Sequence, residues 1–422
     1  GTPVQGVAKS PDKPADPQEA SQVMKDYPAD RIRNIALVGH GGAGKTSLAE
    51  AALFVSGTVN RMGRPEDGNT VSDFDPEEVR RTISIGTSLI PIEWHGHKLN
   101  LLDTPGYADF VGEVISALHA VEAAVVVIDA QAGVEVGTEI AWQHLQELGI
   151  PSIVVVNKVN REHANWTKVL EDLSAAFHAR FVPLQLPIGQ ATDFKGVYGL
   201  VDGKASLGAN GADGAVPADV TAASPKRREA MVEAAAEADE ELMMKFLDDV
   251  SLSDDEVRRG IVAGAKSGSF VPVFFTAASE ALGVHALLDA LTTLAPAPSE
   301  AAPRRAVHKA KGDSVALPPD PSGPLAALVF KTQTDPYVGR LQYVRILSGI
   351  LEADSRVYNV NQGEEERIGP VYVLRGKEQI TQGRIGCGDI GAVAKLAHTR
   401  TGDTLGDKTQ PLALPPFVYP QP

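Results

Sequence analysis

The sequence predicts an α/β fold followed by a smaller domain of β-strands. Up to about residue 294, short apolar runs such as "IALVG", "AAVVVID" and "SIVVVNK" alternate with longer helical stretches. Continuous apolar strands separated by helices indicate a parallel sheet that is covered on both faces. Further along the chain, short β-like runs follow one another at regular spacing, separated by Gly and Asp turns. This second pattern favours a small β-barrel.

Length and composition set the class of protein. A chain of 422 residues is long enough for two or three domains, and its 43% hydrophobic and 22% charged residues are typical of a soluble globular protein. The formal charge of −15 argues against indiscriminate nucleic-acid binding, so we expect no DNA partner. The single cysteine, Cys387, excludes an internal disulfide and suits a reducing compartment. With no signal-peptide pattern and no membrane-spanning run, we expect a cytoplasmic monomer without a membrane partner.

Composition also predicts the domain boundaries. Residues 1–30 are rich in Pro, Ala and charge and are expected to form a disordered tail. The α/β domain is expected at 31–294, a Pro-rich linker at 295–322 and the β-barrel at 323–410. More than a hundred residues separate two of the predicted strands, too many for one crossover, so we predict an inserted subdomain at about 190–268. Its acidic segment "KRREAMVEAAAEADEELMMKFLDD" is expected to be one helix that packs on that subdomain.

A phosphate-binding loop is the strongest chemical signal in the sequence. The segment "GHGGAGKT" satisfies G-x-x-x-x-G-K-[ST] in full, between a predicted strand and a predicted helix. Backbone N–H groups of such a loop bind phosphate oxygens, aided by the helix N-terminus. Lys45 is expected to reach the β- and γ-phosphates and to assist catalysis, and Thr46 to bind Mg²⁺. The residues expected to contact a nucleoside triphosphate here are His40, Gly41, Gly42, Ala43, Gly44, Lys45, Thr46 and Ser47.

The segment "LLDTPGYADF" predicts the metal-binding and phosphate-sensing elements. Asp103 ends a predicted strand, where its carboxylate can hold Mg²⁺ through water. The backbone N–H of Gly106 is placed to meet a γ-phosphate oxygen. From "RRTISI", Ser84 is expected to complete the metal shell from one face of a β-strand, with Thr82 as the rival hydroxyl. Either hydroxyl could instead be an ordinary surface group of that strand.

A base-reading element follows the strand "SIVVV". Asn157 and Lys158 fit the Asn-Lys-x-Asp signature of guanine-nucleotide proteins, but the fourth position is Asn160. A carboxylate accepts bonds from both guanine N1–H and the N2 amine, whereas an amide offers one acceptor and one donor, a loss of about 1–3 kcal/mol. Xanthine would tolerate Asn160 better. Alternatively, Asn160 caps a loop and a neighbouring Asp or Glu reads the base. In "TAA", Ala277 and Ala278 follow the last apolar strand, and the Ala278 N–H is expected at guanine O6.

Taken in order, these segments resemble the elongation factor G family of translational GTPases. The resemblance runs from about residue 31 to 406 and includes the inserted subdomain, "FKTQTDPYVGRLQYVRILSG" and "TGDTL". It implies a factor that binds GTP, GDP and Mg²⁺ and acts on the ribosome through ribosomal RNA and proteins. The chain is similar to the N-terminal two-domain portion of the divergent elongation-factor-G-like paralogues. It departs from the family pattern at six positions, which are Gly41, Gly42, Thr82, Ser84, Tyr107 and Asn160. At these positions the family usually has, in the same order, Ile, Asp, Gly, Thr, His and Asp.

The position of the family's catalytic histidine is occupied by Tyr107. A phenol can donate or accept one hydrogen bond but is a poor proton acceptor, and phosphoryl transfer to water depends mostly on positioning. We therefore predict a GTPase with slow intrinsic hydrolysis that depends on a partner to place the Tyr107 hydroxyl. Tyr107 could instead be a packing residue. The alternative function is a factor that binds GTP or GDP, occupies the ribosome and barely hydrolyses. A small-molecule kinase is disfavoured because it would need neither the guanine-reading element nor the barrel.

Overall fold

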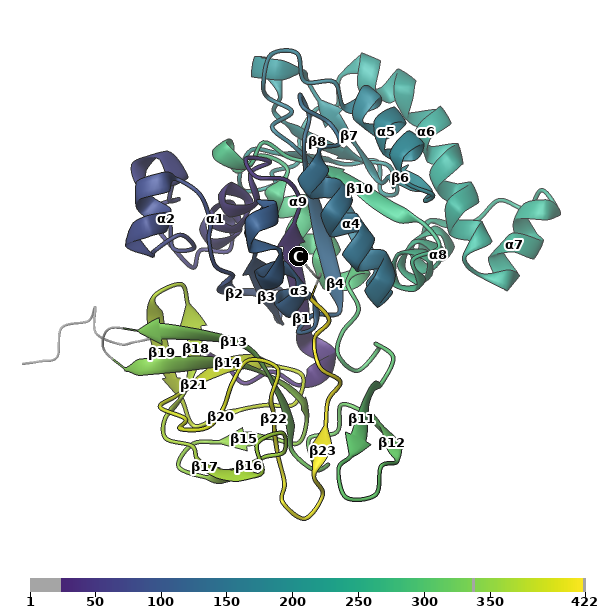
Figure 1. Ribbon diagram of the computed structural model, residues 1–422. Coiled ribbons are helices and arrows are strands. Elements are labelled where there is room, and N and C mark those ends of the chain that lie inside the picture. The colour runs from purple at the N-terminus through teal and green to yellow at the C-terminus, as the bar shows by residue number, and fades with distance from the viewer. Residues whose placement is uncertain (1–23, 336–337, 420–422) are drawn as a thin grey trace, which may run out of the picture.

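The computed structural model describes residues 24–335 and 338–419. Figure 1 shows an upper lobe of strands and helices and a lower lobe made mostly of strands. The predicted fold class, a mixed α/β domain followed by a β domain, is confirmed. Within the described residues, no helix is both long enough and apolar enough to cross a membrane.

A seven-stranded sheet forms the centre of the upper lobe. In spatial order it contains β2 (Ser88–Trp94), β3 (His97–Asp103), β1 (Ile32–Val38), β4 (Ala123–Asp129), β5 (Ser152–Asn157), β10 (Val271–Phe275) and β6 (Phe181–Pro183). Its strands are parallel except for the hairpin between β2 and β3 at one edge. Strands β1, β4, β5 and β10 are buried along their whole length, as their uninterrupted apolar runs predict.

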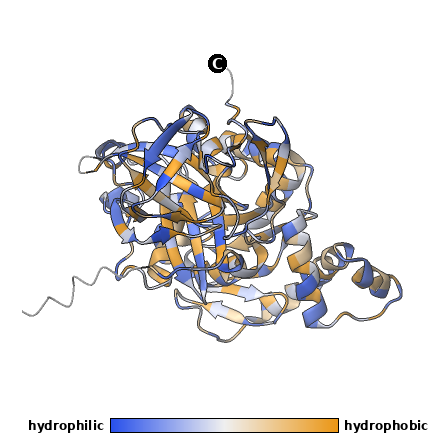
Figure 2. Ribbon diagram, turned by 90° about the horizontal axis from the view of Figure 1, so that it is seen from below, coloured by the Kyte–Doolittle hydropathy of each residue, from blue (hydrophilic) through white to orange (hydrophobic). Residues whose placement is uncertain are grey.

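Helices cover both faces of this sheet and create two hydrophobic cores. One core contains residues of α3 (Val111–Leu118), α4 (Val136–Leu148) and α5 (Trp166–Ala176). The other contains residues of α1 (Lys45–Val55) and α9 (Val284–Leu294). Figure 2 shows hydrophobic colouring concentrated along the inner strands. The sheet is therefore held rigidly from both sides, and the loops at its strand ends are placed by a packed scaffold.

The inserted subdomain begins slightly earlier than predicted, and its acidic segment forms two helices, α6 and α7, where the sequence predicts one. Its small antiparallel sheet contains β7 (Gln185–Ile188), β8 (Gly196–Gly199) and β9 (Ala205–Leu207). The helices are α6 (Ala218–Glu237), α7 (Glu240–Leu247) and α8 (Asp254–Ser267). The predicted single acidic helix breaks because Asp239 caps α7, its carboxylate accepting from Glu241 N and Leu242 N. Figure 1 shows α7 projecting at the end of the upper lobe.

Part of the predicted linker forms regular structure. β11 (Arg304–His308) and β12 (Ser314–Leu317) pair with each other, and β11 also pairs with β23 (Leu412–Ala413). The Pro-rich composition does not reveal these strands, in which Ala306 and Leu317 are buried in the core. The pairing partner of β11 lies about a hundred residues further along the chain, beyond the reach of a local composition signal.

The lower lobe is antiparallel throughout. Its eight-stranded sheet contains, in spatial order, β17 (Glu364–Arg367), β16 (Arg356–Asn359), β22 (Thr404–Gly406), β13 (Ala326–Asp335), β14 (Gly339–Ser348), β21 (Ile390–Ala394), β18 (Val371–Arg375) and β19 (Glu378–Gln382). Two short strands, β15 (Leu351–Glu352) and β20 (Arg384–Ile385), form a separate pair. Val329, Val344 and Val393 lie in the core of this lobe.

Two buried ion pairs join the lobes. Arg345 of β14 lies 2.6 Å from Glu122, which directly precedes β4, and Lys98 of β3 lies 2.7 Å from Asp389 beside β21. Burial raises the pKa of Glu122, although the guanidinium of Arg345 opposes this shift. Charges removed from water in this way require their partners, so the relative position of the lobes is specified by chemistry as well as by shape.

The last residues of the predicted tail are ordered, whereas residues 1–23 lie outside the described part of the chain. Asp26 pairs with Arg384 of β20, and the hydroxyl of Tyr27 donates to Glu93 of β2 at 3.0 Å. The prediction of disorder is therefore wrong for these residues. Their partners are distant in sequence, and composition alone does not reveal such contacts.

Candidate nucleotide-binding site

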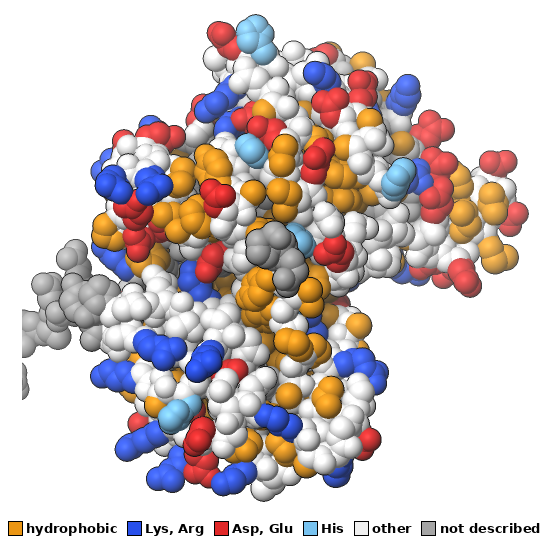
Figure 3. Space-filling view, in the orientation of Figure 1, with side chains coloured by type: hydrophobic (Ala, Val, Ile, Leu, Met, Phe, Trp, Pro, Cys, Tyr) orange, Lys and Arg blue, Asp and Glu red, His pale blue; other side chains and the backbone are white. Residues whose placement is uncertain are grey.

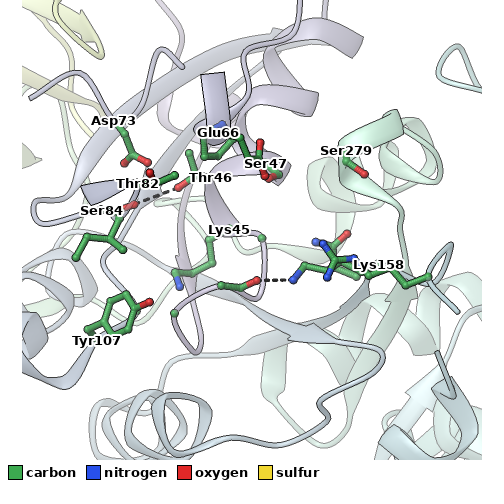
Figure 4. Close-up of a pocket in the computed structure, with 18 residues that line it drawn as sticks. Lys45, Thr46, Ser47, Glu66, Asp73, Thr82, Ser84, Tyr107, Lys158 and Ser279 are labelled. Atoms are coloured by element: carbon green, nitrogen blue, oxygen red, sulfur yellow. Dashed lines mark hydrogen bonds between the residues drawn. The ribbon is translucent and has the colours of Figure 1, made fainter. Parts of the chain in front are cut away.

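The predicted site residues gather where β1, β3, β5 and β10 end (Figure 4). A cavity of about 220 Å³ opens there, and the loop that follows each of β1, β3, β5 and β10 contributes to its wall. Ligands of parallel sheets bind beyond these carboxyl ends. The cavity is lined by Gly41, Gly42, Gly44, Lys45, Thr46, Ser47, Pro65, Glu66, Asp73, Thr82, Ile83, Ser84, Gly106, Tyr107, Asn157, Lys158, Arg161 and Ser279.

The loop between β1 and α1 encloses the ammonium group of Lys45. Lys45 Nζ donates to the backbone oxygens of Gly39 and His40, both at 2.9 Å. Burial lowers the pKa of Lys45 to about 8, although the carboxylate of Asp103 opposes the shift. The hydrogen-bond acceptors of this buried cation are neutral carbonyl groups, so an anionic phosphate would be a favourable additional partner.

The ring of His40 points toward α4 and away from the cavity. Its Nδ1 accepts from Gly137 N at 3.2 Å, and its Nε2 lies 3.4 Å from Glu135. The contribution to nucleotide binding that the sequence predicts for His40 therefore comes from its backbone atoms and not from its ring.

The end of β5 is bound directly to the phosphate loop. Asn157 Nδ2 donates to Ala43 O at 3.0 Å, and Lys158 Nζ donates to Gly42 O at 2.6 Å. Lys158 also pairs with Asp129 at 2.7 Å. Burial opposes ionisation of Asp129, but the bonds from Lys158 and from backbone N–H groups outweigh it and hold its pKa below the usual range. The base-reading and phosphate-binding segments thus form one connected unit.

Hydroxyl and carboxylate groups meet at the start of α1. Thr46 Oγ1 donates to Asp103 Oδ2 at 2.8 Å and lies 3.2 Å from Ser84 Oγ. Ser72 Oγ donates to the same Asp103 oxygen. The other oxygen of Asp103, Oδ1, is buried without a hydrogen-bond partner among the described residues. A buried carboxylate oxygen without a partner is unfavourable, and a neighbouring cation would relieve it.

Asp73 adds a second carboxylate that the sequence does not indicate. Burial and the nearby charge of Asp103 raise the pKa of Asp73 to about 7, and burial also raises the pKa of Asp103. Two buried carboxylates with the hydroxyls of Thr46 and Ser84 form an oxygen donor set that fits Mg²⁺. Within residues 24–335 and 338–419, no group of three or more His, Cys, Asp or Glu side chains could hold a metal by itself. Phosphate and water oxygens would complete such a shell.

Ser84 lies in a loop, so its predicted placement on a β-strand is wrong. The preceding helix α2 (Pro76–Arg81) begins with a capping box formed by Asp75 and Glu78, which overrides the β-like pattern. Glu78 then accepts from the backbone N–H groups of Ile85 and Gly86, at 2.9 and 3.0 Å, and holds the loop in place.

The two candidate hydroxyls in this loop are placed differently. Thr82 ends α2 with a φ of 57° and lines the cavity, but its side chain makes no hydrogen bond to any described residue. Ser84 is the hydroxyl that contacts Thr46.

The loop after β3 lies directly on the phosphate loop. Gly106 O accepts from Gly41 N at 3.1 Å, and a Cβ at position 106 would collide with Lys45 Nζ. The ring of Tyr107 covers Gly41, where an added Cβ would lie 2.6 Å from Tyr107 Cζ. Tyr107 is 42% exposed, and its hydroxyl has no hydrogen-bond partner in the described part of the chain. Only a glycine at position 41 admits this arrangement.

The loop after β10 differs from the prediction in one respect. Ala278 N donates to Asn157 Oδ1 at 3.0 Å, and Ala277 N donates to Leu282 O at the same distance. The Ala278 N–H, predicted to face a guanine oxygen, is therefore already bonded to the predicted base-reading asparagine. Asn160 Nδ2 donates to Glu280 Oε1 at 2.6 Å.

Several residues of the site could not be predicted from the sequence. Ser72 and Asp73 belong to no recognised motif, and they face Asp103 because Glu50 of α1 accepts from Val71 N and Ser72 N. Glu280 lies two residues after Ala278, and this proximity to the segment "TAA" is the sequence signal that could identify it.

Comparison with known proteins identifies the family of both domains. Residues 30–297 match the family model of the elongation factor Tu GTP binding domain, and residues 324–408 match that of elongation factor G domain 2. A crystal structure of a protein from Thermus thermophilus is similar, with a TM-score of 0.79 and 32% sequence identity. The match covers 90% of this chain and 55% of that one, so the chain spans about half the length of that relative.

The fold and the matched domain define a guanine-nucleotide-binding protein of the GTPase class. More narrowly, the chain belongs to the elongation factor G family of translational GTPases.

Proposed function

We propose that this protein binds GTP and GDP with Mg²⁺ and hydrolyses GTP in the cytoplasm as a monomeric factor on the ribosome. One observation carries the proposal: Thr46 of the phosphate loop contacts both Asp103 and Ser84, at 2.8 and 3.2 Å. Three separate segments therefore meet at the point where the terminal phosphate and its metal ion would lie. Such a junction can respond to the loss of the γ-phosphate.

Each residue of the site has a proposed role in binding the nucleotide or the metal ion. Lys45 and the backbone of the phosphate loop hold the phosphates, and Gly106 N–H contacts the γ-phosphate. Thr46, Ser84, Asp73 and Asp103 would hold Mg²⁺ directly or through water. A bound Mg²⁺ supplies charge neutralisation and orientation of the phosphates.

Tyr107 is the proposed water-orienting residue. Its hydroxyl, free of partners among the described residues, can accept a hydrogen bond from the attacking water or donate one to a phosphate oxygen. Because the ring is 42% exposed, a partner that covers it would fix the hydroxyl. This supports slow intrinsic hydrolysis that a partner accelerates.

The charge distribution of the β domain supports a ribosomal partner. Figure 3 shows Lys and Arg side chains gathered on the lower lobe, although the chain as a whole is acidic. Exposed basic side chains attract RNA phosphates in a salt-dependent manner. Besides Arg384 and Lys408, which pair with Asp26 and Glu365, the exposed basic residues of this lobe include Arg340, Arg356, Arg367, Lys377, Lys395 and Arg400.

The second candidate function is a factor that occupies the ribosome with bound GTP or GDP and hardly hydrolyses. It is favoured by the same residue, because a phenol is a weak proton acceptor and the Tyr107 hydroxyl has no hydrogen-bond partner among the described residues. In that case Tyr107 would be a packing residue of the loop.

Phosphate release from GTP, measured with and without ribosomes, separates these functions. The proposal predicts slow release by the protein alone and faster release with ribosomes, suppressed when Lys45 is replaced by Ala. Nucleotide binding without stimulated release would support the second candidate, and no nucleotide binding would contradict both.

A further inference from the structure

We propose that Glu280 supplies the guanine-reading carboxylate that position 160 lacks. The inference rests on the proposed function, because it assigns a specificity-determining residue to the same nucleotide site. Glu280 ends the short helix η5 (Ala278–Glu280), which follows β10, and Asn160 follows β5. The side chains of these two residues meet across the loops.

The hydrogen bond between the two side chains determines what each can offer a base. Asn160 Nδ2 donates to Glu280 Oε1 at 2.6 Å. This bond engages one N–H of the Asn160 amide. Asn160 Oδ1 and Glu280 Oε2 then remain without a hydrogen-bond partner among the described residues. The pair therefore presents two acceptors, and Glu280 engages one of the two N–H donors of Asn160 Nδ2.

The two loops are held in register by their backbones. Val159 N donates to Thr276 O at 3.3 Å, and Ala278 N donates to Asn157 Oδ1 at 3.0 Å. Glu280 N donates to Ala277 O at 3.0 Å, which closes the turn that carries the carboxylate. Backbone hydrogen bonds therefore fix the positions of the two loops that carry Asn160 and Glu280.

The two loops that carry Asn160 and Glu280 border the nucleotide cavity. Ser279, the residue before Glu280, lines the cavity together with Lys158 and Arg161, which flank Asn160 in sequence (Figure 4). Asn160 and Glu280 do not line the cavity themselves, but each is one residue away from a residue that does, Arg161 and Ser279 respectively.

Two acceptors match the edge of guanine. N1–H and the N2 amine are both donors, and the Asn160–Glu280 pair can accept one bond from each. The conflict expected of an isolated amide, a donor facing a donor, is reduced because Glu280 engages one N–H of Asn160 Nδ2. Xanthine carries an oxygen in place of the N2 amine, and that oxygen would face a carboxylate. The structure thus favours guanine over xanthine, the reverse of the preference that Asn160 alone predicts.

Equilibrium binding of GDP and of xanthosine diphosphate, with Mg²⁺ present, tests this assignment. We expect Glu280→Gln and Glu280→Ala each to weaken GDP binding about 10- to 100-fold, the effect of losing one hydrogen bond to a charged group. Binding of xanthosine diphosphate should weaken less or improve. Glu171→Gln, an exposed substitution on α5, is the matched control and should leave the ratio of the two affinities unchanged.

A charge exchange provides the second arm of the test. The double variant Asn160→Asp with Glu280→Gln moves the carboxylate to position 160 and should restore GDP binding to within a few-fold of the original. A purely structural role of Glu280 would not be rescued in this way. An unchanged affinity ratio in both single variants would overturn the inference while leaving the proposed function intact. A parent chain that binds no GDP would contradict the proposed function itself, and with it the inference.

Discussion

The ring of Tyr107 lies against the backbone of Gly41 so closely that a methyl group on residue 41 would reach 2.6 Å from Tyr107 Cζ. These two residues are also two of the positions at which the sequence departs from the family pattern. The contact makes the departures interdependent: the missing side chain at position 41 creates the space that the larger ring occupies.

Gly41→Ala is therefore expected to push Tyr107 out of its position. Because the ring is partly exposed, it can swing away at little cost in folding, but the hydroxyl then leaves the phosphate side of the cavity. We expect stimulated hydrolysis to fall about 10- to 100-fold, as for other displaced catalytic groups, with GDP affinity little changed. Gly112→Ala on α3 is the matched control, since a Cβ there makes only ordinary contacts with Tyr419, the nearest at 3.7 Å. Equal hydrolysis by both variants would refute the steric argument.

Tyr107→Phe separates the hydroxyl from the ring. If the hydroxyl orients water or contacts the phosphate, stimulated hydrolysis should fall by about 100-fold, as on removal of one catalytic hydrogen bond. The ring contact with Gly41 and the GDP affinity should persist. Single-turnover phosphate release and GDP titration measure the two effects, and unchanged hydrolysis would identify Tyr107 as a packing residue.

Asp73→Asn is expected to raise or preserve the melting temperature in the absence of metal and to weaken the binding of Mg²⁺. In EDTA the substitution removes repulsion between two buried carboxylates, so the melting temperature should rise or stay level. With GDP the affinity for Mg²⁺ should fall about 10-fold or more, because a charged ligand becomes a neutral one. Glu66→Gln, at an exposed carboxylate lining the same cavity, controls for general loss of charge. A lower melting temperature in EDTA together with unchanged metal affinity would argue against a metal site here.

The pair of Arg345 and Glu122 is expected to hold the two lobes together. Arg345→Met leaves the buried carboxylate of Glu122 without its ion-pair partner, with Asn34 Nδ2 still donating to it, and should lower the free energy of unfolding by about 3–5 kcal/mol, measured by denaturant titration. The exposed pair of Lys408 and Glu365 provides the comparison, and Lys408→Met should change little. Similar effects of both substitutions would mean that packing, and not the buried pair, joins the lobes.

The parts of the site that the sequence could predict are those encoded within one strand, loop and helix. Lys45, Thr46, Asp103 and Asn157 lie at fixed offsets from strand ends, so spacing alone places them at the same edge of the sheet. Ser84 is identified by its chemistry but misplaced in structure, since the α2 capping box outweighs the alternating pattern.

Other features depend on contacts between distant segments and have no local signal. Ser72 and Asp73 lie near Asp103 in a segment that Glu50 anchors through Val71 N and Ser72 N. Glu280 meets Asn160 across 120 residues of sequence. The pairing of β11 with β23 is of the same kind, and so are the contacts that order Asp26 and Tyr27.

Equilibrium titration of the unsubstituted protein with GDP and ADP in the presence of Mg²⁺ tests the central claim most directly. We predict saturable binding of GDP at one site, and ADP binding at least about 100-fold weaker, because adenine leaves the polar groups around Asn157 and Asn160 unmatched. Equal affinity for the two nucleotides, or no binding of either, would contradict the assignment of a guanine-nucleotide site.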